Sequence, residues 1–350
     1  MSTFYSLTVS KIAELTHNSV AVTLAVPKNL TGTFSFKAGQ YITIKHMISG
    51  KEVRRAYSIS SSPNEGDITV GIKKVADGTF SVYANESLKE GEVLEVMPPE
   101  GRFVFTPGNS AQHIAAFAAG SGITPIMSIA KTVLDGHPES TFVLVYGNQN
   151  IAETMFHEEL SALSRKYAER FFIQFVYSRA HEDDGLFGHI ENSTVNLIVK
   201  NKFKDRVFDS FYICGPEPMI HLVKNSLLAS GIPEKLIHFE LFTASDTVEV
   251  DVSEDLKGVT QLEVTLDDEV HTVTMDRKKF VLDAILDEDL DAPYSCQGGV
   301  CSTCIARVTE GKAEMVKNQI LTDSEIEDGF ILTCQAHALT PTLKIDYDDV

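Results

Sequence analysis

Four cysteines near one end of the chain constrain its fold more than any other feature. Cys296, Cys301 and Cys304 are separated by four and then two residues, and Cys334 comes after a further 29. The chain has five cysteines among 350 residues, which is too few for a disulfide scaffold. Three thiols within nine residues converge only if the loop wraps tightly. The spacing therefore predicts a compact unit built around a centre that thiolates bind.

Two kinds of thiolate centre compete for this spacing. Zinc sites usually combine pairs of closely spaced ligands rather than a C-x4-C that leads into a C-x2-C. The pattern C-x4-C-x2-C with a distant fourth cysteine is that of a plant-type 2Fe–2S cluster. Gly298 and Gly299 let backbone amides approach the cluster sulfurs, and the small Ser302 and Thr303 fit beside the loop. We therefore predict that a 2Fe–2S cluster is bound by Cys296, Cys301, Cys304 and Cys334.

Composition and charge exclude several other classes of protein. Hydrophobic residues make up 43% of the chain and charged residues 23%, an ordinary globular composition. No uninterrupted apolar stretch of about 18 residues is present, and the first residues lack a secretory signal. We therefore expect no membrane insertion and a cytoplasmic location.

The net charge of −19 disfavours nucleic acid as a partner, because phosphate binding needs clustered Lys and Arg. Residues 259–350 contain 19 acidic and 7 basic residues, so this part carries −12. Such a strongly acidic unit is suited to steering toward a basic docking surface on another protein. A purely solubilising role explains the charge equally well.

Patterning divides the rest of the chain into two regions. Up to Pro107, short alternating runs bounded by turn residues predict a small antiparallel barrel. Its expected strands are 7–10, 19–26, 41–45, 68–74 and 93–97. Beyond Pro107, apolar runs alternate with helical stretches, which predicts a parallel sheet covered on both faces. Its expected strands are 114–118, 141–146, 171–177 and 209–214, and its expected helices 125–134, 155–167 and 218–230.

The remaining segments complete the predicted organisation. Residues 243–257 lack periodicity and indicate a linker, whereas 261–275 read as a hairpin followed by a helix over 281–290. We therefore expect domains at 1–107, 108–242 and 259–350, with a linker at 243–258.

The cysteine flanks, Pro293-Tyr294-Ser295-Cys296 and Leu332-Thr333-Cys334-Gln335-Ala336, resemble the plant-type ferredoxin family. That resemblance implies a β-grasp fold for the C-terminal domain. The run Arg55-Ala56-Tyr57-Ser58 resembles the R-x-Y-S flavin motif of the ferredoxin–NADP reductase superfamily. It implies that Arg55 neutralises a flavin phosphate, that Tyr57 packs on the isoalloxazine, and that Ser58 hydrogen-bonds near N5.

A second stretch resembles the pyrophosphate-binding segment of the same superfamily. It contains Ile72 and Lys73 and continues to Gly78 and Ser81. Gly78 permits a close turn, and Ser81 is expected to begin a helix whose amides face phosphate. This second phosphate site favours FAD over FMN, although one branch of the superfamily uses FMN.

The segment Gly120-Ser121-Gly122-Ile123-Thr124-Pro125 follows an apolar strand and opens a helix. A glycine turn at a helix start is an anion site suited to a dinucleotide pyrophosphate, with Pro125 in the first turn. By the same resemblance, Thr124 lies beside the nicotinamide, and Cys214-Gly215-Pro216 lies beside its C4 carbon.

Two strand ends complete the predicted site. Ser178 and Arg179 suit the 2′-phosphate of NADPH, but Gly188-His189 stands where many relatives have an arginine, so NADH stays open. Glu240 and Phe242 are implied to reach the flavin, with an ordinary edge strand as the alternative. The predicted catalytic residues are Ser58, Cys214 and Glu240.

The resemblance covers the whole chain and implies a Rossmann-like NAD(P)-binding domain between an FAD-binding β-barrel and the ferredoxin domain. It is strongest to reductase components of phenylacetyl-CoA epoxidases. Electrons would then pass from NAD(P)H through FAD and the 2Fe–2S cluster to a protein acceptor, a di-iron oxygenase component. Other acceptors are a ring-hydroxylating oxygenase, a fatty-acid desaturase or a hybrid-cluster protein, and a non-catalytic redox-sensing adaptor is the alternative from another class.

Overall fold

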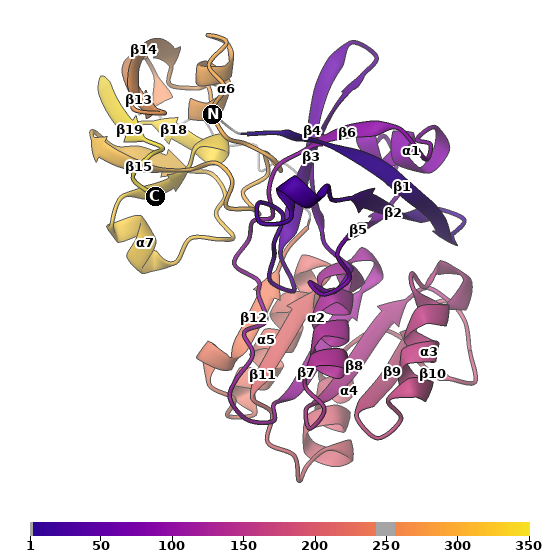
Figure 1. Ribbon diagram of the computed structural model, residues 1–350. Helices are drawn as coiled ribbons and strands as arrows, with labels where there is room; N and C mark the ends of the chain where they lie inside the picture. The colour runs from indigo at the N-terminus through magenta and orange to yellow at the C-terminus, as the bar shows by residue number, and fades with distance from the viewer. Residues whose placement is uncertain (1–2, 243–255) are drawn as a thin grey trace. The chain divides into compact units, whose positions relative to one another are not determined.

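The computed structural model describes residues 3–242 and 256–350 (Figure 1). The chain divides into two compact units, Tyr5–Phe242 and, together with the first four residues, Thr243–Val350. Most of the predicted linker 243–258 lies outside the described residues. The domain boundaries expected at 107 and 258 stay predictions.

The first part of the larger unit is a six-stranded antiparallel sheet with strand order β4-β3-β6-β1-β2-β5. Its edges meet where Ile59 bridges Val70 and the Ser60 amide donates to the Thr69 carbonyl at 2.7 Å, so the sheet closes into a barrel. Leu7, Val22 and Ile44 are fully buried inside it. Its elements are β1 (Tyr5–Thr16), β2 (Ser19–Ala25), β3 (Tyr41–Ile48), β4 (Lys51–Ser58), β5 (Ile68–Lys73), β6 (Val93–Val96) and α1 (Thr79–Glu86).

Strand β4 was not among the expected strands, although it carries the flavin motif. Its sequence, Lys-Glu-Val-Arg-Arg-Ala-Tyr-Ser, lacks the apolar alternation that marks a half-buried strand. It forms because it pairs with β3 along its whole length, from Lys51 opposite Ile48 to Ser58 opposite Tyr41. Ser49 and Gly50, both with positive φ, make the tight turn between the two strands.

Helix α1 begins at Thr79, two residues before the expected start at Ser81, and Gly78 caps it. The Ser81 hydroxyl points back toward the turn and accepts a hydrogen bond from the Val75 amide at 3.3 Å. A Cβ atom on Gly78 would overlap that hydroxyl oxygen. The glycine is therefore what allows the turn to close so tightly on the helix.

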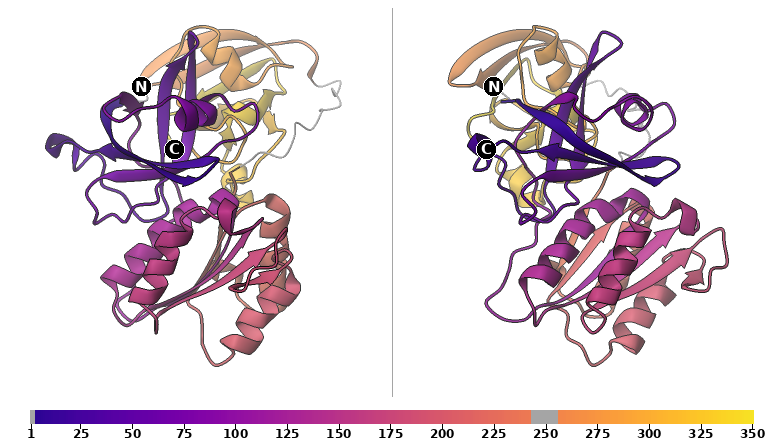
Figure 2. Two further views of the ribbon diagram at one scale, coloured as in Figure 1. Left: turned by 90° about the vertical axis from the view of Figure 1, so that its right-hand side faces the viewer. Right: turned by 45° about the vertical axis from the view of Figure 1, so that its right-hand side comes forward.

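The second part of the larger unit is a parallel sheet with strand order β10-β9-β8-β7-β11-β12. Figure 2 shows helices on both of its faces, as predicted, with α2 and α3 on one side and α5 on the other. The elements are β7 (His113–Ala119), α2 (Ile123–Gly136), β8 (Thr141–Asn148), α3 (His157–Lys166), β9 (Phe171–Tyr177), β10 (Gly185–Phe187), α4 (Asn192–Asn196), β11 (Ser210–Cys214), α5 (Glu217–Ala229) and β12 (Ile237–Glu240).

The smaller unit contains a five-stranded mixed sheet, order β14-β13-β19-β15-β17, and a two-stranded sheet of β16 and β18. The predicted hairpin is present, with Asp267 and Asp268 in left-handed conformation at its turn. The predicted helix ends at Leu286 rather than Leu290, because Asp289 has a φ of 56° and turns the chain away. The elements are β13 (Val259–Leu266), β14 (Glu269–Asp276), α6 (Val281–Leu286), β15 (Ile305–Glu310), β16 (Ala313–Met315), α7 (Asp323–Glu327), β17 (Phe330–Leu332), β18 (Ala336–Ala338) and β19 (Thr342–Asp346).

These three folds confirm the predicted antiparallel barrel, parallel α/β domain and C-terminal ferredoxin-like domain. Across residues 3–242 and 256–350, no helix has both the length and the apolar character that crossing a bilayer requires.

Candidate functional site

The carboxyl ends of the parallel strands bring several predicted site residues into one row. Ala118 pairs with Cys214 on one side and with Tyr146 on the other, and Cys214 pairs with Glu240. In an open parallel sheet, ligands bind at this edge of the strands. Cys214 of β11 therefore lies beside the strand that leads into the glycine turn, and Glu240 of β12 lies one strand further along the sheet.

Ser58 connects this row to the barrel. Its hydroxyl, at the end of β4, donates a hydrogen bond to the Glu240 carboxyl oxygen Oε2 at 3.2 Å. Both side chains are buried, and burial raises the pKa of Glu240 to about 8, while the hydrogen bond from Ser58 opposes the rise. A carboxyl group that stays neutral near pH 7 can hold or release a proton inside the site.

Cys214 is completely buried, and its backbone is in contact with the glycine turn. Desolvation, followed by the nearby Glu240 carboxylate, raises the pKa of the Cys214 thiol well above its usual value. The group is therefore a neutral thiol rather than a thiolate. That character suits a small apolar contact beside a reacting carbon and does not suit a nucleophile.

The predicted dinucleotide turn is a single 3-10 turn, Gly120–Gly122, that leads directly into α2. Gly120 has a φ of 53°, and no atom lies within 4 Å of the place where its Cβ would be. Gly122 packs so closely on the Cys214 carbonyl that a Cβ there would overlap it. The Thr124 hydroxyl donates to the Ser121 carbonyl at 3.0 Å, and Pro125 occupies the third position of the helix.

One residue that supports this turn was not among the predicted site residues. Tyr146, fully buried on the neighbouring strand β8, donates its hydroxyl hydrogen to the Gly120 carbonyl at 2.9 Å. Burial raises the pKa of the Tyr146 hydroxyl far above its usual value, so it remains a donor. The only sequence signal was its place at the end of an apolar strand, in Tyr146-Gly147-Asn148.

The barrel and the parallel sheet meet at this site. A Cβ on Gly71 of β5 would lie 2.7 Å from the Thr124 methyl group, so β5 lies directly against the start of α2. Ser128 of α2 donates to the Ser61 carbonyl at 2.7 Å, next to the end of the flavin motif. Phe242 is half-buried and packs against the core of the parallel sheet.

The other predicted flavin residues lie along the barrel. Arg55 is exposed, and its guanidinium donates to the Arg54 carbonyl at 2.7 Å. The half-buried Tyr57 ring lies 5.7 Å from that of Phe80 on α1. The Ile72 side chain is fully buried, so only its backbone can meet a cofactor, and the Lys73 ammonium lies 4.0 Å from Glu153.

Ser178 and Arg179 directly follow β9, at the same sheet edge as the glycine turn. The Ser178 amide donates to the Asn148 carbonyl and the Arg179 amide to the Gln149 carbonyl, both at 2.9 Å. The Arg179 side chain is exposed. This arrangement leaves the guanidinium available to a phosphate.

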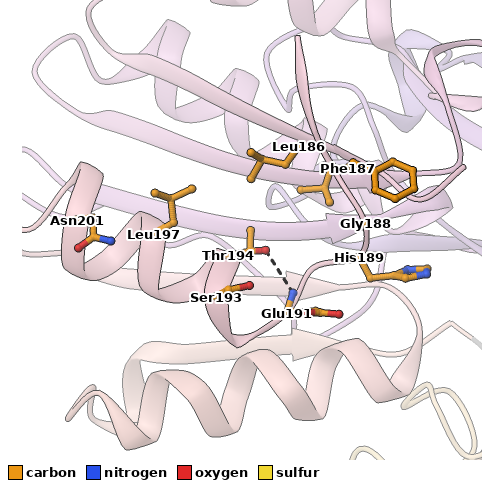
Figure 3. A pocket seen from close by; sticks show the side chains of 10 residues that line it. Leu186, Phe187, Gly188, His189, Glu191, Ser193, Thr194, Leu197 and Asn201 are labelled. Atoms are coloured by element: carbon orange, nitrogen blue, oxygen red, sulfur yellow. Dashed lines mark hydrogen bonds between the residues drawn. The ribbon is translucent and has the colours of Figure 1, made fainter. Parts of the chain in front are cut away.

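A hollow of about 440 Å³ lies near these residues, between β10 and the helical segment that follows it (Figure 3). Leu186 and Phe187 line it from the strand, and Thr194 and Leu197 from the helical side. His189 also lines it, at the place where many members of the resembled superfamily have an arginine. None of the predicted site residues lines this hollow.

The four predicted cluster ligands converge in the smaller unit. The thiols are close enough to shift one another's pKa: Cys301 and Cys334 lower the pKa of the Cys296 thiol, and Cys334 lowers that of the Cys304 thiol. The neighbouring thiols and two backbone amides lower the pKa of the Cys296 thiol, and the Gly298 amide is one of the donors, at 3.3 Å. Thiolates surrounded by amide donors are the ligand set of an iron–sulfur cluster.

The loop geometry also fits a cluster. Gly299 has a φ of 72°, and a Cβ there would lie 2.9 Å from the Lys317 carbonyl oxygen. Within the described residues, no group of three or more His, Cys, Asp or Glu side chains has the close spacing of a site for one metal ion. The spacing C-x4-C-x2-C with a distant fourth cysteine is what favours a 2Fe–2S cluster over a single zinc ion.

Three family models match successive parts of the chain. Residues 6–105 match an oxidoreductase FAD-binding domain, 117–225 an oxidoreductase NAD-binding domain, and 264–339 a 2Fe-2S iron-sulfur cluster binding domain. A component of the 1,2-phenylacetyl-CoA epoxidase from Escherichia coli is 38% identical over 99% of both chains. The chain belongs to this family of three-domain reductases. It is an NAD(P)H-dependent oxidoreductase that uses FAD and a 2Fe–2S cluster.

Two further proteins show how widely this plan is used. The ferredoxin reductase component of 3-ketosteroid-9-alpha-monooxygenase from Rhodococcus rhodochrous is 35% identical over 97% of this chain and 96% of its own. The solved structure of phthalate dioxygenase reductase matches with a TM-score of 0.63 at 22% identity, covering 98% of each chain, and shows the same fold.

Proposed function

We propose that this three-domain reductase delivers electrons from NAD(P)H to the oxygenase component of a di-iron phenylacetyl-CoA epoxidase. The observation that carries the catalytic part is the buried hydrogen bond between Ser58 of the barrel and Glu240 of the nucleotide domain. It unites the flavin motif with the strand ends where the nicotinamide would lie.

The two cofactors have complementary chemistry: bound FAD accepts a hydride from NAD(P)H, and a bound 2Fe–2S cluster accepts one electron at a time. In the proposal, Arg55, Gly78 and Ser81 hold the flavin phosphates, with Ile72 and Lys73 beside them, and Tyr57 packs on the ring. The nicotinamide dinucleotide takes Gly120, Gly122, Thr124 and Pro125 for its pyrophosphate, and Ser178 and Arg179 for its adenosine end.

The chain's own residues position the nicotinamide and the flavin for hydride transfer. Cys214 and Gly215 form one wall beside the reacting carbon, and Phe242 shields the flavin face in the absence of nucleotide. With flavin bound, the Ser58 hydroxyl hydrogen would turn from Glu240 toward N5. Glu240, neutral up to about pH 8, would then donate its carboxyl proton to the Ser58 oxygen and hold that hydroxyl in place. Cys296, Cys301, Cys304 and Cys334 hold the cluster.

The choice of acceptor is supported by the relatives. The similarity to the E. coli epoxidase component covers 99% of both chains at 38% identity, compared with 35% identity for the steroid monooxygenase component. The exposed Arg179 favours NADPH over NADH. The expected cytoplasmic location stays a prediction.

Two assays test the proposal. NAD(P)H-dependent reduction of cytochrome c or dichlorophenol-indophenol by the reconstituted protein measures turnover, and absence of activity would support a redox-sensing adaptor instead. Substrate epoxidation by the purified oxygenase component of a phenylacetyl-CoA epoxidase, compared with turnover by a steroid monooxygenase component, then measures the choice of acceptor. Faster turnover with the steroid component would refute the epoxidase assignment while leaving the reductase intact.

A further inference from the structure

Two buried hydroxyl groups form a chain of hydrogen bonds that ends at one predicted cluster ligand. The Tyr347 hydroxyl, from the residue after β19, donates to the Thr333 hydroxyl oxygen at 2.8 Å. The Thr333 hydroxyl in turn donates to the Cys304 carbonyl at 3.1 Å. Thr333 is completely inaccessible and Tyr347 nearly so, and neither residue belongs to the predicted ligand set.

The order of the two bonds fixes where the protons point. Because Tyr347 gives its hydrogen to the Thr333 oxygen, the Thr333 hydrogen is free to point toward Cys304 and cannot be returned to Tyr347. Hydrogen bonds arranged head to tail in this way strengthen one another, most of all where water is excluded. The Thr333 amide also donates to the Cys304 carbonyl, at 3.1 Å, so two donors of the same residue hold one ligand.

We infer that Thr333 and Tyr347 are positioning residues that set the reduction potential of the 2Fe–2S cluster through Cys304. Donors that polarise the backbone carbonyl of a ligand cysteine draw electron density away from its thiolate, which stabilises the extra negative charge of the reduced cluster and so raises its potential. Thr333 would act directly on Cys304, and Tyr347 would act through Thr333. Both residues would determine how readily the cluster accepts an electron, not whether it binds.

The test is a spectroelectrochemical titration of the full chain with its cofactors, comparing three variants. Removing the donor in Thr333→Val should weaken reduction about tenfold, which for a one-electron couple is a potential lower by about 59 mV. Tyr347→Phe, which removes a single oxygen atom, should lower the potential in the same direction by less. Thr333→Ser, which keeps the hydroxyl, should restore the wild-type value.

A matched control and a spectroscopic readout separate positioning from general disturbance. Thr309→Val removes an exposed hydroxyl from β15 of the same unit and should leave the potential unchanged. Electron–nuclear double resonance of the reduced cluster in H₂O and D₂O should lose one exchangeable proton in Thr333→Val but not in Thr333→Ser.

Three results would overturn the inference. One is an unchanged potential in both Thr333→Val and Tyr347→Phe with the cluster fully loaded. Another is an equal shift in Thr309→Val. The third is loss of the cluster from Tyr347→Phe, because that result would make the hydroxyl pair a requirement of assembly rather than a determinant of potential.

Discussion

Glu240 shows how burial and one hydrogen bond define a site at the scale of single residues. Its carboxyl group is enclosed between the barrel and the parallel sheet, and Ser58 is its hydrogen-bond partner. Because burial penalises the charged form, the folded protein keeps this group protonated at pH values where an unfolded chain would have lost the proton.

The first prediction concerns the effect of this residue on stability. The pKa of Glu240 is raised from 4.5 to about 8, so the folded state binds the extra proton between these values. Stability from this group is complete below about pH 4.5 and declines as the pH rises through about 8. In Glu240→Gln, which cannot titrate, this decline should disappear. Melting temperatures of both proteins from pH 5 to 9 measure it, and parallel profiles would show that Glu240 is not neutral in the folded chain.

Cys214 gives a second prediction at this scale. Its buried neutral thiol is placed against the turn that would hold the nucleotide, so Cys214→Ala removes a contact beside the reacting carbon. We expect flavin reduction by NAD(P)H to slow about tenfold or more while flavin stays bound, since a 1 Å misplacement can cost about a hundredfold. Anaerobic stopped-flow absorbance measures the rate, and an unchanged rate would remove Cys214 from catalysis.

Most of the candidate site residues lie in contiguous motifs and could be predicted from the sequence. The others act through partners that are distant in the sequence and could not be predicted. The cysteine spacing and the R-x-Y-S run are contiguous patterns that can be found in the sequence. Tyr146 lies 26 residues from its partner Gly120, and Tyr347 lies 14 from Thr333, and no local pattern relates them. Those pairings exist only because the sheets bring distant segments together.

At the scale of elements, the glycine turn before α2 depends on support from β8. Tyr146 holds the Gly120 carbonyl, which fixes the direction of the first amides of the turn. A similar hydroxyl–carbonyl bond, from Tyr212 to Val104 at 3.2 Å, lies on β11, on the other side of β7 from β8, and away from the turn.

The third prediction compares the loss of the Tyr146 hydroxyl with the loss of the Tyr212 hydroxyl. Tyr146→Phe loses a hydrogen bond worth about 1 kcal/mol, so the KM for NAD(P)H should rise about fivefold with little change in kcat. Tyr212→Phe, the matched control, should change stability by a similar amount without changing KM. Steady-state kinetics and calorimetric binding of NADP⁺ measure both, and equal KM values in the two variants would deny Tyr146 a role in binding.

Element prediction succeeded where apolar periodicity was strong and failed where it was weak. The strands of the parallel sheet core and the helices α2, α3 and α5 were expected within a few residues of their observed ends. Strand β4 was missed because two arginines and a lysine interrupt its pattern, and β10 and α4 because they are too short to show one. Their positions depend on pairing with neighbours that the local sequence does not reveal.

At the scale of the whole molecule, the residues predicted to bind flavin and nucleotide share one compact unit, whereas the four cysteines predicted to hold the cluster belong to the other. The fourth prediction follows from this separation. Cys301→Ser should abolish the visible absorption of the cluster yet leave at least half of the NAD(P)H-to-dye activity through flavin. Absorption spectra and dichlorophenol-indophenol reduction measure the two effects, and loss of flavin reduction as well would contradict separate modules.

The central claim is that one chain passes electrons from a nicotinamide nucleotide to an iron–sulfur centre. Electron paramagnetic resonance of the purified chain, frozen anaerobically after addition of NADPH or NADH, tests it most directly. We expect the signal of a reduced 2Fe–2S cluster, absent before the nucleotide is added. A flavin that bleaches while the cluster stays oxidised, or bound zinc in place of iron and acid-labile sulfide, would contradict it.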